Sequence, residues 1–237
     1  MKRIDAIILA GGLGTRLREV VKDQPKVLAP VNGRPFLELV LDSLNKLPCL
    51  QRVVIAVGHM SEKIRVEFAD PGKYRFEIIY SEEKDLLGTG GATKKALQYT
   101  ETKDVLVMNG DTYVEININD LIQFHYEKGA AATLVLRSVE DPSRYGTVKL
   151  VGDRVTSFEE KKLDGTGHWI NAGMYIFRRD LYDQVKEGQV ISLERELLPG
   201  FIDHDVYGFK CFGTFIDIGT PESYAKANFV FQRNREG

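Results

Sequence analysis

The stretch IDAIILAGGLGTRL (Ile4–Leu17) runs from an apolar segment into a glycine-rich turn that leads to an arginine. Its apolar part, Ile7–Leu9, contains no polar residue, which is typical of a strand buried on both faces in a parallel sheet. Because ligands in such sheets bind beyond the carboxyl ends of the strands, the turn lies where a ligand is expected.

The glycine-rich turn has the residue types of a phosphate-binding loop. Gly11, Gly12 and Gly14 allow backbone angles that residues with a Cβ resist, so that amide N–H groups can close around an anion. Arg16 adds a forked cation and Lys26 a compact one, a pairing that suits a polyphosphate. The sequence therefore predicts a nucleoside triphosphate site.

Two well-known glycine motifs do not fit this turn. No Gly-Lys-Ser/Thr follows the glycines at the spacing of a Walker A loop, and Gly12–Leu17 lacks the third glycine of a dinucleotide-binding fingerprint. A tight strand-to-helix turn without a ligand stays open as the alternative. Such a turn would need neither Arg16 nor Lys26.

Composition narrows the class of protein. The 237 residues are 43% hydrophobic and 28% charged, which is ordinary for a globular protein, and the formal net charge of −2 argues against a general nucleic-acid or membrane-surface binder. Cys49 and Cys211 show no metal-ligand spacing and predict reduced thiols. The charged start leaves no room for a signal peptide, and no apolar run approaches the ~20 residues of a membrane span, so we expect a cytoplasmic protein.

Helix-like and strand-like segments alternate after the turn. Apolar residues at helical spacing predict a helix over 36–44 and another that starts at Ser61, which can cap it. Apolar runs predict strands over 52–58, 76–80 and 104–111. This alternation predicts an α/β fold with a doubly wound, mostly parallel sheet.

From Ala130 onward the pattern changes. A strand over 131–137 is followed by two strand-like segments, 145–150 and 155–158, joined through a Gly152-Asp153 turn. This is the pattern of a hairpin, so we expect the mixed sheet to gain an antiparallel portion.

Gly11–Arg16, followed by Pro25-Lys26, resembles the signature of the sugar-1-phosphate nucleotidyltransferases, also called nucleotide-sugar pyrophosphorylases. Further segments fit this family in the same order, at 88–91, 109–111, 159–161, 170–175 and 214–222. The resemblance covers nearly the whole chain. It implies a Rossmann-like, GT-A-like fold in a single domain, 1–237. The resemblance also implies a nucleotide-binding half, 1–129, and a sugar-phosphate-binding half, 130–237, whose antiparallel portion binds the sugar.

The reaction implied by this resemblance is attack of a sugar 1-phosphate oxygen on the α-phosphorus of a nucleoside triphosphate, with release of pyrophosphate. Arg16 would face the leaving pyrophosphate and Lys26 the α-phosphate. The resemblance implies nucleotide contacts from Leu9, Gly11, Gly12, Gly14, Thr15, Arg16, Glu83, Gly88, Thr89, Asn109 and Gly110. A packing role for the glycines of 88–91, with Thr89 as a helix cap, stays open.

Two aspartates are candidate metal ligands and catalytic residues. Asp111 ends a strand just after a glycine, a place that suits Mg²⁺, although a simple Asn-Gly-Asp turn is the alternative. Asp217 lies between apolar neighbours, which is costly for a charge unless it is paired or bound to a metal. In the family, both matching positions are metal carboxylates, so the implied cofactor is Mg²⁺.

The sugar-phosphate half supplies its own candidate residues through the resemblance. Glu160 would bind sugar hydroxyls and Lys161 the sugar phosphate, although a solvated surface lysine is the simpler interpretation of Lys161 taken alone. The full set implied is Tyr145, Gly146, Glu160, Lys161, Asn171 and Gly173.

One residue bears on the base. Glu83 stands where many thymidine- and uridine-specific members have glutamine, and a carboxylate can accept both N1–H and N2–H₂ of guanine. We therefore expect GTP, with an exposed glutamate without a role as the alternative.

The stretch Arg18–Leu37, together with 143–148 and 158–161, looks most like the D-glycero-α-D-manno-heptose 1-phosphate guanylyltransferases. Val27 departs from that pattern, which has proline there. Mannose-1-phosphate guanylyltransferases and N-acetylmuramate or hexose 1-phosphate uridylyltransferases stay open. A non-catalytic regulatory subunit is the alternative from another class, but such a protein would be expected to lose Arg16, Lys26 or an acidic ligand. A homo-oligomer also stays open.

Overall fold

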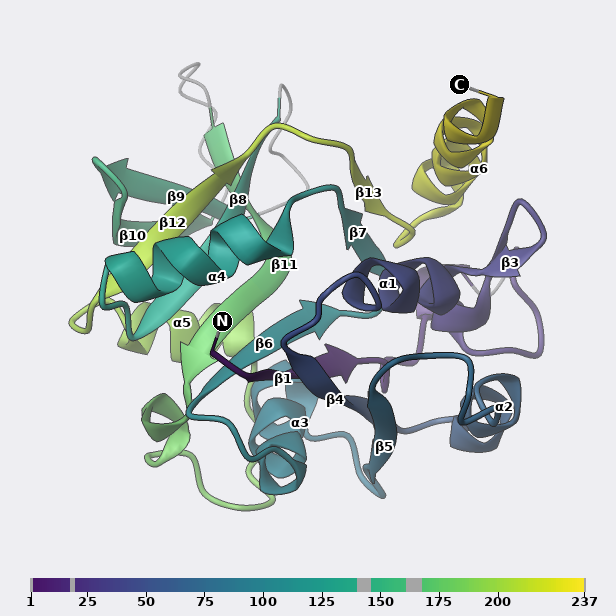
Figure 1. Cartoon of the computed structure of the whole chain (residues 1–237), viewed down its shortest axis with the longest axis horizontal. Helices are drawn as coiled ribbons and strands as arrows, with labels where there is room; N and C mark the ends of the chain where they lie inside the picture. The colour runs from purple at the N-terminus through teal and green to yellow at the C-terminus, as the bar shows by residue number, and fades with distance from the viewer. Residues whose placement is uncertain (1, 18–19, 140–145, 161–167, 237) are drawn as a thin grey trace.

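The computed structural model describes residues 2–17, 20–139, 146–160 and 168–236. The main sheet of this part contains β1 (Ile4–Leu9), β4 (Leu50–Val57), β5 (Glu77–Glu82), β6 (Asp104–Asn109), β8 (Ala132–Val139), β9 (Gly146–Val151), β10 (Arg154–Glu160), β11 (His168–Arg178) and β12 (Val206–Cys211). Their order is β5-β4-β1-β6-β11-β8-β12-β10-β9 (Figure 1).

The expected mixed and mostly parallel sheet is confirmed. Among the described strands, β5, β4, β1 and β6 pair in parallel, and β8 and β12 pair in parallel beyond the antiparallel β11. Only β10 and β11 run against the other strands of this sheet. The expected hairpin is β9–β10, which is antiparallel.

Helices cover both faces of the sheet. The described ones are α1 (Phe36–Leu44), α2 (Ser61–Glu67), α3 (Gly88–Ala96), α4 (Ile118–Glu127), α5 (Leu198–Gly200) and α6 (Pro221–Glu236). Ile8 of β1 packs into the core beneath α1, α2 and α4, whereas Ile7 packs into the core beneath α3 and α5. Neighbouring residues of one fully buried strand therefore serve two cores, as the apolar run predicts.

Strand β11 changes partner along its length. Its first residues pair with β9, its last residues pair with β6, and β8 follows both parts on the other edge. The register shifts between Asn171 and Tyr175, around Gly173 with its φ of +71°. This glycine bulge bends the strand, so β11 joins β6 and β9 in one sheet.

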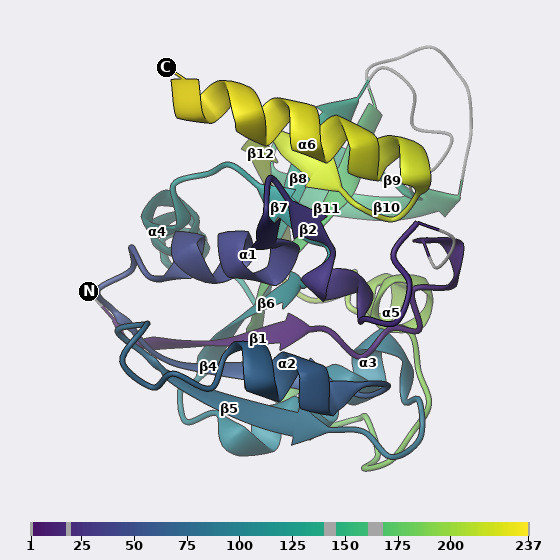
Figure 2. The ribbon, with the colours of Figure 1, turned by 90° about the vertical axis from the view of Figure 1, so that its right-hand side faces the viewer.

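A small ribbon completes the fold beside the main sheet. β7 (Thr112–Val114) pairs antiparallel with β13 (Phe215–Asp217), and α6 follows and packs against β13 and β2 (Pro30–Val31) (Figure 2). The Thr220 hydroxyl accepts the N–H of Ser223, so Thr220 caps the last helix.

Two helix caps that the sequence suggests, Ser61 and Thr89, are wrong. Ser61 is the first residue of α2 after Met60, which has a left-handed backbone, and its hydroxyl donates to Glu82 (2.8 Å) instead of closing the helix. Thr89 lies inside α3, which begins at Gly88, and its hydroxyl turns toward Glu194 (2.7 Å). In both cases a carboxylate supplied by tertiary packing competes for the hydroxyl.

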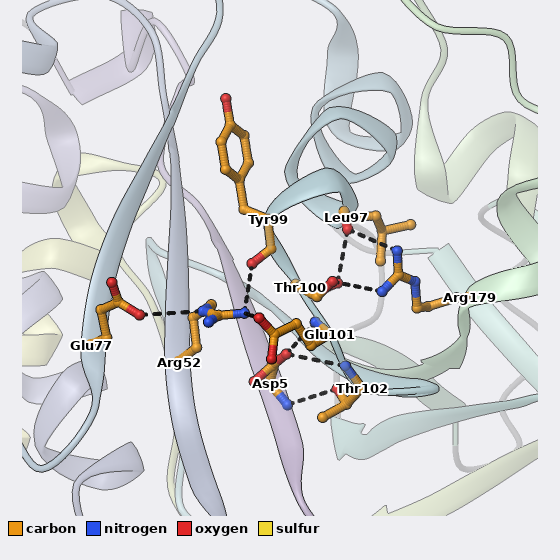
Figure 3. A network of polar contacts seen from close by, with 9 residues as sticks. All are labelled: Asp5, Arg52, Glu77, Leu97, Tyr99, Thr100, Glu101, Thr102 and Arg179. Carbon is orange, nitrogen blue, oxygen red and sulfur yellow. Dashed lines mark hydrogen bonds and ion pairs between the residues drawn. The ribbon is translucent and has the colours of Figure 1, made fainter.

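A polar network fixes the connection between α3 and β6, and Figure 3 shows its contacts. The buried Asp5 carboxylate accepts the backbone N–H groups of Glu101 (2.7 Å) and Thr102 (3.2 Å). The Arg179 guanidinium donates to the carbonyl oxygen of Thr100 (2.6 Å). The network therefore ties the start of β1 to the segment that leads into β6.

We expect Asp5→Ala to lower the free energy of unfolding by about 1–3 kcal/mol, because it removes a buried carboxylate that accepts two backbone N–H groups. Urea denaturation measures the loss. Asp70→Ala is the matched control, since Asp70 also accepts a backbone N–H, from Gly72 (2.8 Å), but is exposed, and its loss should stay within about 0.5 kcal/mol. Equal losses in the two variants would contradict the role given to Asp5.

Candidate active site

A cavity of about 480 Å³ opens where β1 and β6 end. Leu9 and Asn109, the last residues of these strands, form part of its wall, which is the expected place for a ligand in such a sheet. The glycine turn and the start of α3 form the other walls. The remaining lining residues are Ala10, Gly11, Gly12, Leu13, Gly14, Thr15, Arg16, Lys26, Val27, Glu83, Leu86, Gly88, Thr89, Ala92, Asp111 and Gly219.

Two glycines of the turn, Gly11 and Gly14, lie too close to their neighbours to carry side chains. A Cβ on Gly11 would lie 2.9 Å from a carboxylate oxygen of Glu83, and one on Gly14, where φ is +59°, would lie 2.9 Å from the Cβ of Lys26. Gly12 has nothing within 4 Å of its Cβ position. The glycines thus let Glu83 and Lys26 approach the turn, while Gly12 leaves open space beside the cavity.

Arg16 extends the turn as an exposed cation. It lies in the single helical turn Thr15–Leu17, which the buried Leu17 anchors to the core. Within the described part of the chain, no hydrogen bond or ion pair holds its guanidinium. A forked cation on the cavity wall that no described residue pairs with is suited to an incoming anion.

Lys26 and Asp111 form an ion pair at the cavity. Lys26 Nζ lies 2.5 Å from Asp111 Oδ2, and the side chains are 13% and 33% exposed. The other oxygen of Asp111 accepts a long bond from the Thr112 hydroxyl (3.3 Å). The structure therefore places a cation and a carboxylate side by side at the end of β6.

Asp217 ends strand β13, which pairs with β7, the strand that directly follows Asp111. In the β7–β13 ribbon Asp217 pairs with Thr112, and the N–H of Ile218 donates to the carbonyl oxygen of Asp111 (3.1 Å). The Asp217 carboxylate accepts the N–H of Gly219 (2.6 Å), and Gly219 lines the cavity. The ribbon thus brings together two aspartates that lie far apart in the sequence.

Glu83 is half-buried and faces the turn, unlike the exposed glutamate of the alternative interpretation. Its N–H pairs with Val57 at the end of β4 (2.8 Å), and its carboxylate accepts the N–H of Leu87 (3.0 Å). Burial raises the pKa of the Glu83 carboxyl, and the Leu87 bond opposes that rise. A carboxylate therefore stands on the cavity wall beside Gly11.

The glycines of 88–91 have a packing role as well as a place at the cavity. A Cβ on Gly88 would lie 2.7 Å from the carbonyl oxygen of Ile191, and one on Gly91 would lie 2.2 Å from that of Gln189. The N–H groups of Gly90 and Gly91 both donate to Ile191. Gly88 and Thr89 line the cavity, so both interpretations of this segment hold in part.

The sugar-phosphate candidates are only partly described. Tyr145, Lys161 and the side chain of Glu160 lie outside the described residues. Gly146 pairs with Glu160 in the β9–β10 hairpin. Asn171 accepts the N–H of Gly173 (3.0 Å) in the bulge of β11.

Most of the expected nucleotide-binding residues line one cavity, but Gly110 does not. A Cβ on Gly110 would lie 3.0 Å from the carbonyl oxygen of Leu9, so this glycine lets β1 and β6 approach behind the cavity wall. Gly173 likewise lies behind the wall, where its Cβ would lie 2.6 Å from the amide nitrogen of Asn109. Sequence reasoning missed the apolar wall residues Leu13 and Leu86, which are 42% and 49% exposed.

The nucleotidyl transferase family matches residues 5–233 of the chain. The chain belongs to this family. The expected sugar-1-phosphate nucleotidyltransferase family, the enzyme class and the fold are thereby confirmed. Within the described residues, no helix has the length and apolar character needed to span a membrane.

Two relatives are similar to this chain over almost its full length. The chain is 38% identical over 231 residues to the D-glycero-alpha-D-manno-heptose 1-phosphate guanylyltransferase of Aneurinibacillus thermoaerophilus, covering 97% of this chain and 99% of the relative. It is also 38% identical to the enzyme of that name from Campylobacter jejuni, covering 93% and 97% of the two chains.

A solved structure shows the same fold. The crystal structure of HddC from Yersinia pseudotuberculosis complexed with GMP-PN superposes with a TM-score of 0.83 at 32% identity, covering 96% of this chain and 99% of that one.

Proposed function

We propose that this nucleotidyltransferase transfers the GMP group of GTP to D-glycero-α-D-manno-heptose 1-phosphate, with Mg²⁺ as cofactor. The observation that carries the proposal is the cavity, where the glycine turn, Arg16 and the Lys26–Asp111 pair meet beside the Glu83 carboxylate. The names of the two guanylyltransferase relatives and the GMP-PN complex of the Yersinia protein support this choice of substrates.

The reaction requires charge neutralisation and alignment of the substrates more than it requires a general base. A sugar 1-phosphate is already a nucleophilic dianion, and one of its oxygens bonds to the α-phosphorus while the bond to the bridging oxygen of pyrophosphate breaks. The protein must neutralise two polyanions, align them and stabilise the charge that builds on pyrophosphate. We assign Arg16 to the leaving pyrophosphate, Lys26 to the α-phosphate and Lys161 to the sugar phosphate.

The carboxylates of Asp111 and Asp217, beside and in the β7–β13 ribbon, fit Mg²⁺. Asp111 and Asp217 offer hard carboxylate oxygens, and Asp111 already holds a cation in the form of Lys26. Among the described residues there is no cluster of three or more His, Cys, Asp or Glu that could hold a metal, so phosphate and water oxygens would complete the shell, as Mg²⁺ prefers. Bound Mg²⁺ would supply charge neutralisation on the phosphates.

Guanine suits the position of Glu83. Its carboxylate stands on the wall of the cavity, against Gly11. A carboxylate accepts the two adjacent N–H donors of guanine, whereas uracil and thymine present a single N–H with a carbonyl acceptor on each side. We therefore propose that Glu83 selects GTP.

We expect Glu83→Gln to lower kcat/KM for GTP by roughly 10- to 100-fold, because a hydrogen bond to a charged group contributes about 1.5–3 kcal/mol. The glutamine keeps an acceptor for the Leu87 N–H, so the fold should be unchanged. Steady-state rates with GTP and UTP measure the effect.

Glu82→Gln is the control for this variant, since Glu82 is adjacent but exposed and pairs with Arg65 (3.0 Å) away from the cavity. It should keep the wild-type preference for GTP. Unchanged base selectivity in Glu83→Gln would overturn the assignment of guanine to this carboxylate.

A substrate matrix tests the proposed function as a whole. Purified protein with Mg²⁺ is given GTP, UTP or dTTP against the 1-phosphates of heptose, mannose and N-acetylmuramate, and pyrophosphate release is measured. We expect the fastest release with GTP and the heptose. Preference for mannose 1-phosphate would replace the sugar, preference for UTP or dTTP would replace the base, and no release from any pair would favour the regulatory subunit.

A further inference from the structure

A second cavity, of about 410 Å³, borders the glycine turn. Part of its lining also belongs to the first cavity, at the ends of β1 and β6, namely Gly12, Leu13, Gly14 and Lys26. The rest of its lining, which the first cavity does not share, is Leu17, Val21, Lys22, Asp23, Gln24, Pro25, His59 and Met60. The turn and Lys26 are therefore walls common to two neighbouring cavities.

The second cavity lies at the same edge of the sheet as the first. His59 and Met60 come directly after the end of β4, and β4 pairs in parallel with β1, which leads into the glycine turn. Ligands in such sheets bind beyond the carboxyl ends of the strands. The end of β4 is therefore a place where a ligand is expected.

Two residues of the second cavity have a left-handed backbone although neither is a glycine. The angle φ is +58° at Asp23 and +60° at Met60, and among the described residues Asn32 is the one other case outside glycine. Lys63 of α2 donates a hydrogen bond to the carbonyl oxygen of Asp23. A residue as bulky as methionine rarely adopts this conformation, and such strain persists where packing enforces it, often beside a ligand site.

The charges of the second cavity favour an anion. Lys22 and Lys26 bring ammonium groups to its lining, and the ring of His59 carries at least one N–H donor. The lining residues that the structure describes include one carboxylate, that of Asp23. The side chains of Lys22 and His59 are exposed, and no described residue forms a hydrogen bond or ion pair with either of them.

Pyrophosphate is the anion that forms beside this cavity. Nucleotidyl transfer to a sugar 1-phosphate releases it whichever base and sugar react. We propose that the second cavity receives pyrophosphate once its bond to the α-phosphorus has broken, and that Lys22 and His59 bind it there. A cationic site next to the place of reaction attracts the product away from Arg16 and so assists its release, a step that often limits turnover.

Pyrophosphate has the same chemistry as the β- and γ-phosphates of a bound nucleotide, so the test must separate the two. The protein is first saturated with Mg²⁺ and a non-hydrolysable analogue of the nucleoside triphosphate that it uses fastest, which fills the first cavity. Pyrophosphate is then titrated in and its binding is measured by calorimetry. We expect pyrophosphate to bind to this loaded protein, because the second cavity stays open.

Lys22→Gln should raise the Kd of pyrophosphate in this titration by about 5- to 20-fold. Hydrogen bonds to charged groups are among the stronger ones, and the exposure of Lys22 to solvent keeps the effect at the lower end of their range. The constant for product inhibition by pyrophosphate should rise by the same factor. The Kd of the nucleotide analogue should stay within about threefold of wild type.

Three further variants distinguish a bound anion from a general effect of charge. Lys22→Arg keeps the charge and should bind pyrophosphate like the wild type, whereas His59→Gln combined with Lys22→Gln should bind it more weakly than Lys22→Gln alone. Lys84→Gln is the matched control, because Lys84 is an exposed lysine that follows β5 and lines neither cavity. It should bind pyrophosphate like the wild type.

The proposal is overturned if pyrophosphate does not bind to the analogue-loaded protein, or if Lys22→Gln leaves its Kd unchanged. It is also overturned if Lys22→Gln weakens the nucleotide analogue as much as pyrophosphate, since that result assigns Lys22 to the phosphates of the substrate. Because every pair of substrates releases pyrophosphate, a nucleotide or sugar other than those proposed above would not affect this test.

Discussion

Asp111→Asn should lower kcat by 10²-fold or more, the largest effect that we expect from a single isosteric change in this protein. The substitution keeps the shape of the side chain but removes the negative charge that faces Lys26 and that we assign to Mg²⁺. Initial rates at saturating nucleotide, sugar phosphate and Mg²⁺ measure it. Losses of this size are typical when a preorganised group that stabilises the transition state is removed.

The control for this variant is Asp120→Asn, a change of the same size at an exposed carboxylate of α4 that accepts a bond from Asn117 (2.9 Å). It should leave kcat unchanged. Near-normal turnover of a folded Asp111→Asn protein would remove Asp111 from the reaction and, with it, the proposed metal site.

Lys26→Gln should lower kcat by roughly 10²-fold for a separate reason. The Lys26 side chain is only 13% exposed, whereas Arg16 is exposed, and an enclosed charge is screened less by water than an exposed one. We expect the loss in kcat with little change in melting temperature, because the partner Asp111 stays partly exposed to solvent. Single-turnover rates and thermal melts measure the two effects.

Lys73→Gln is the matched control, since it removes a similarly short ion pair, with Glu38 (2.6 Å), and neither residue lines the cavity. Lys73→Gln should keep full activity. If the two lysine variants lose activity to the same small extent, the loss comes from a broken surface pair and the role assigned to Lys26 is wrong.

The sequence is most informative where a local pattern and a tertiary position coincide. The apolar run Ile7–Leu9 predicts a strand buried on both faces, and its two sides do serve the two cores. Because the carboxyl ends of parallel strands lie at one edge of the sheet, the strand pattern alone predicts that the glycine turn, Asn109 and Asp111 lie close together. All three line the same cavity.

Packing decides what local patterns leave open. The glycines of 88–91 read equally well as a ligand loop or as a close helix start, and the carbonyls of Gln189 and Ile191, a hundred residues later, give them a packing role. Ser61 has the residue type of a helix cap, yet Glu82 on the neighbouring strand takes its hydroxyl. Such competitors for a hydroxyl group cannot be found from spacing.

Long separations hide the rest of the site. Asp217 reaches Asp111 only through the β7–β13 ribbon, so the family resemblance and not the spacing suggested that pair. Glu194 belongs to no motif, and its hydrogen bond from Thr89 emerges only from the fold. The family resemblance singles out Glu83, but only the pairing of β4 and β5 shows that its carboxylate lies against Gly11.

A crystal structure of this protein with a non-hydrolysable GTP analogue and Mg²⁺ tests most directly whether the cavity binds GTP with its base at Glu83. We expect the guanine edge to lie within hydrogen-bond distance of the Glu83 carboxylate, with the phosphates at Gly11–Gly14 and Lys26 moved from Asp111 toward the α-phosphate. A nucleotide bound outside this cavity, or a base turned away from Glu83 with the phosphates distant from Asp111, would contradict it.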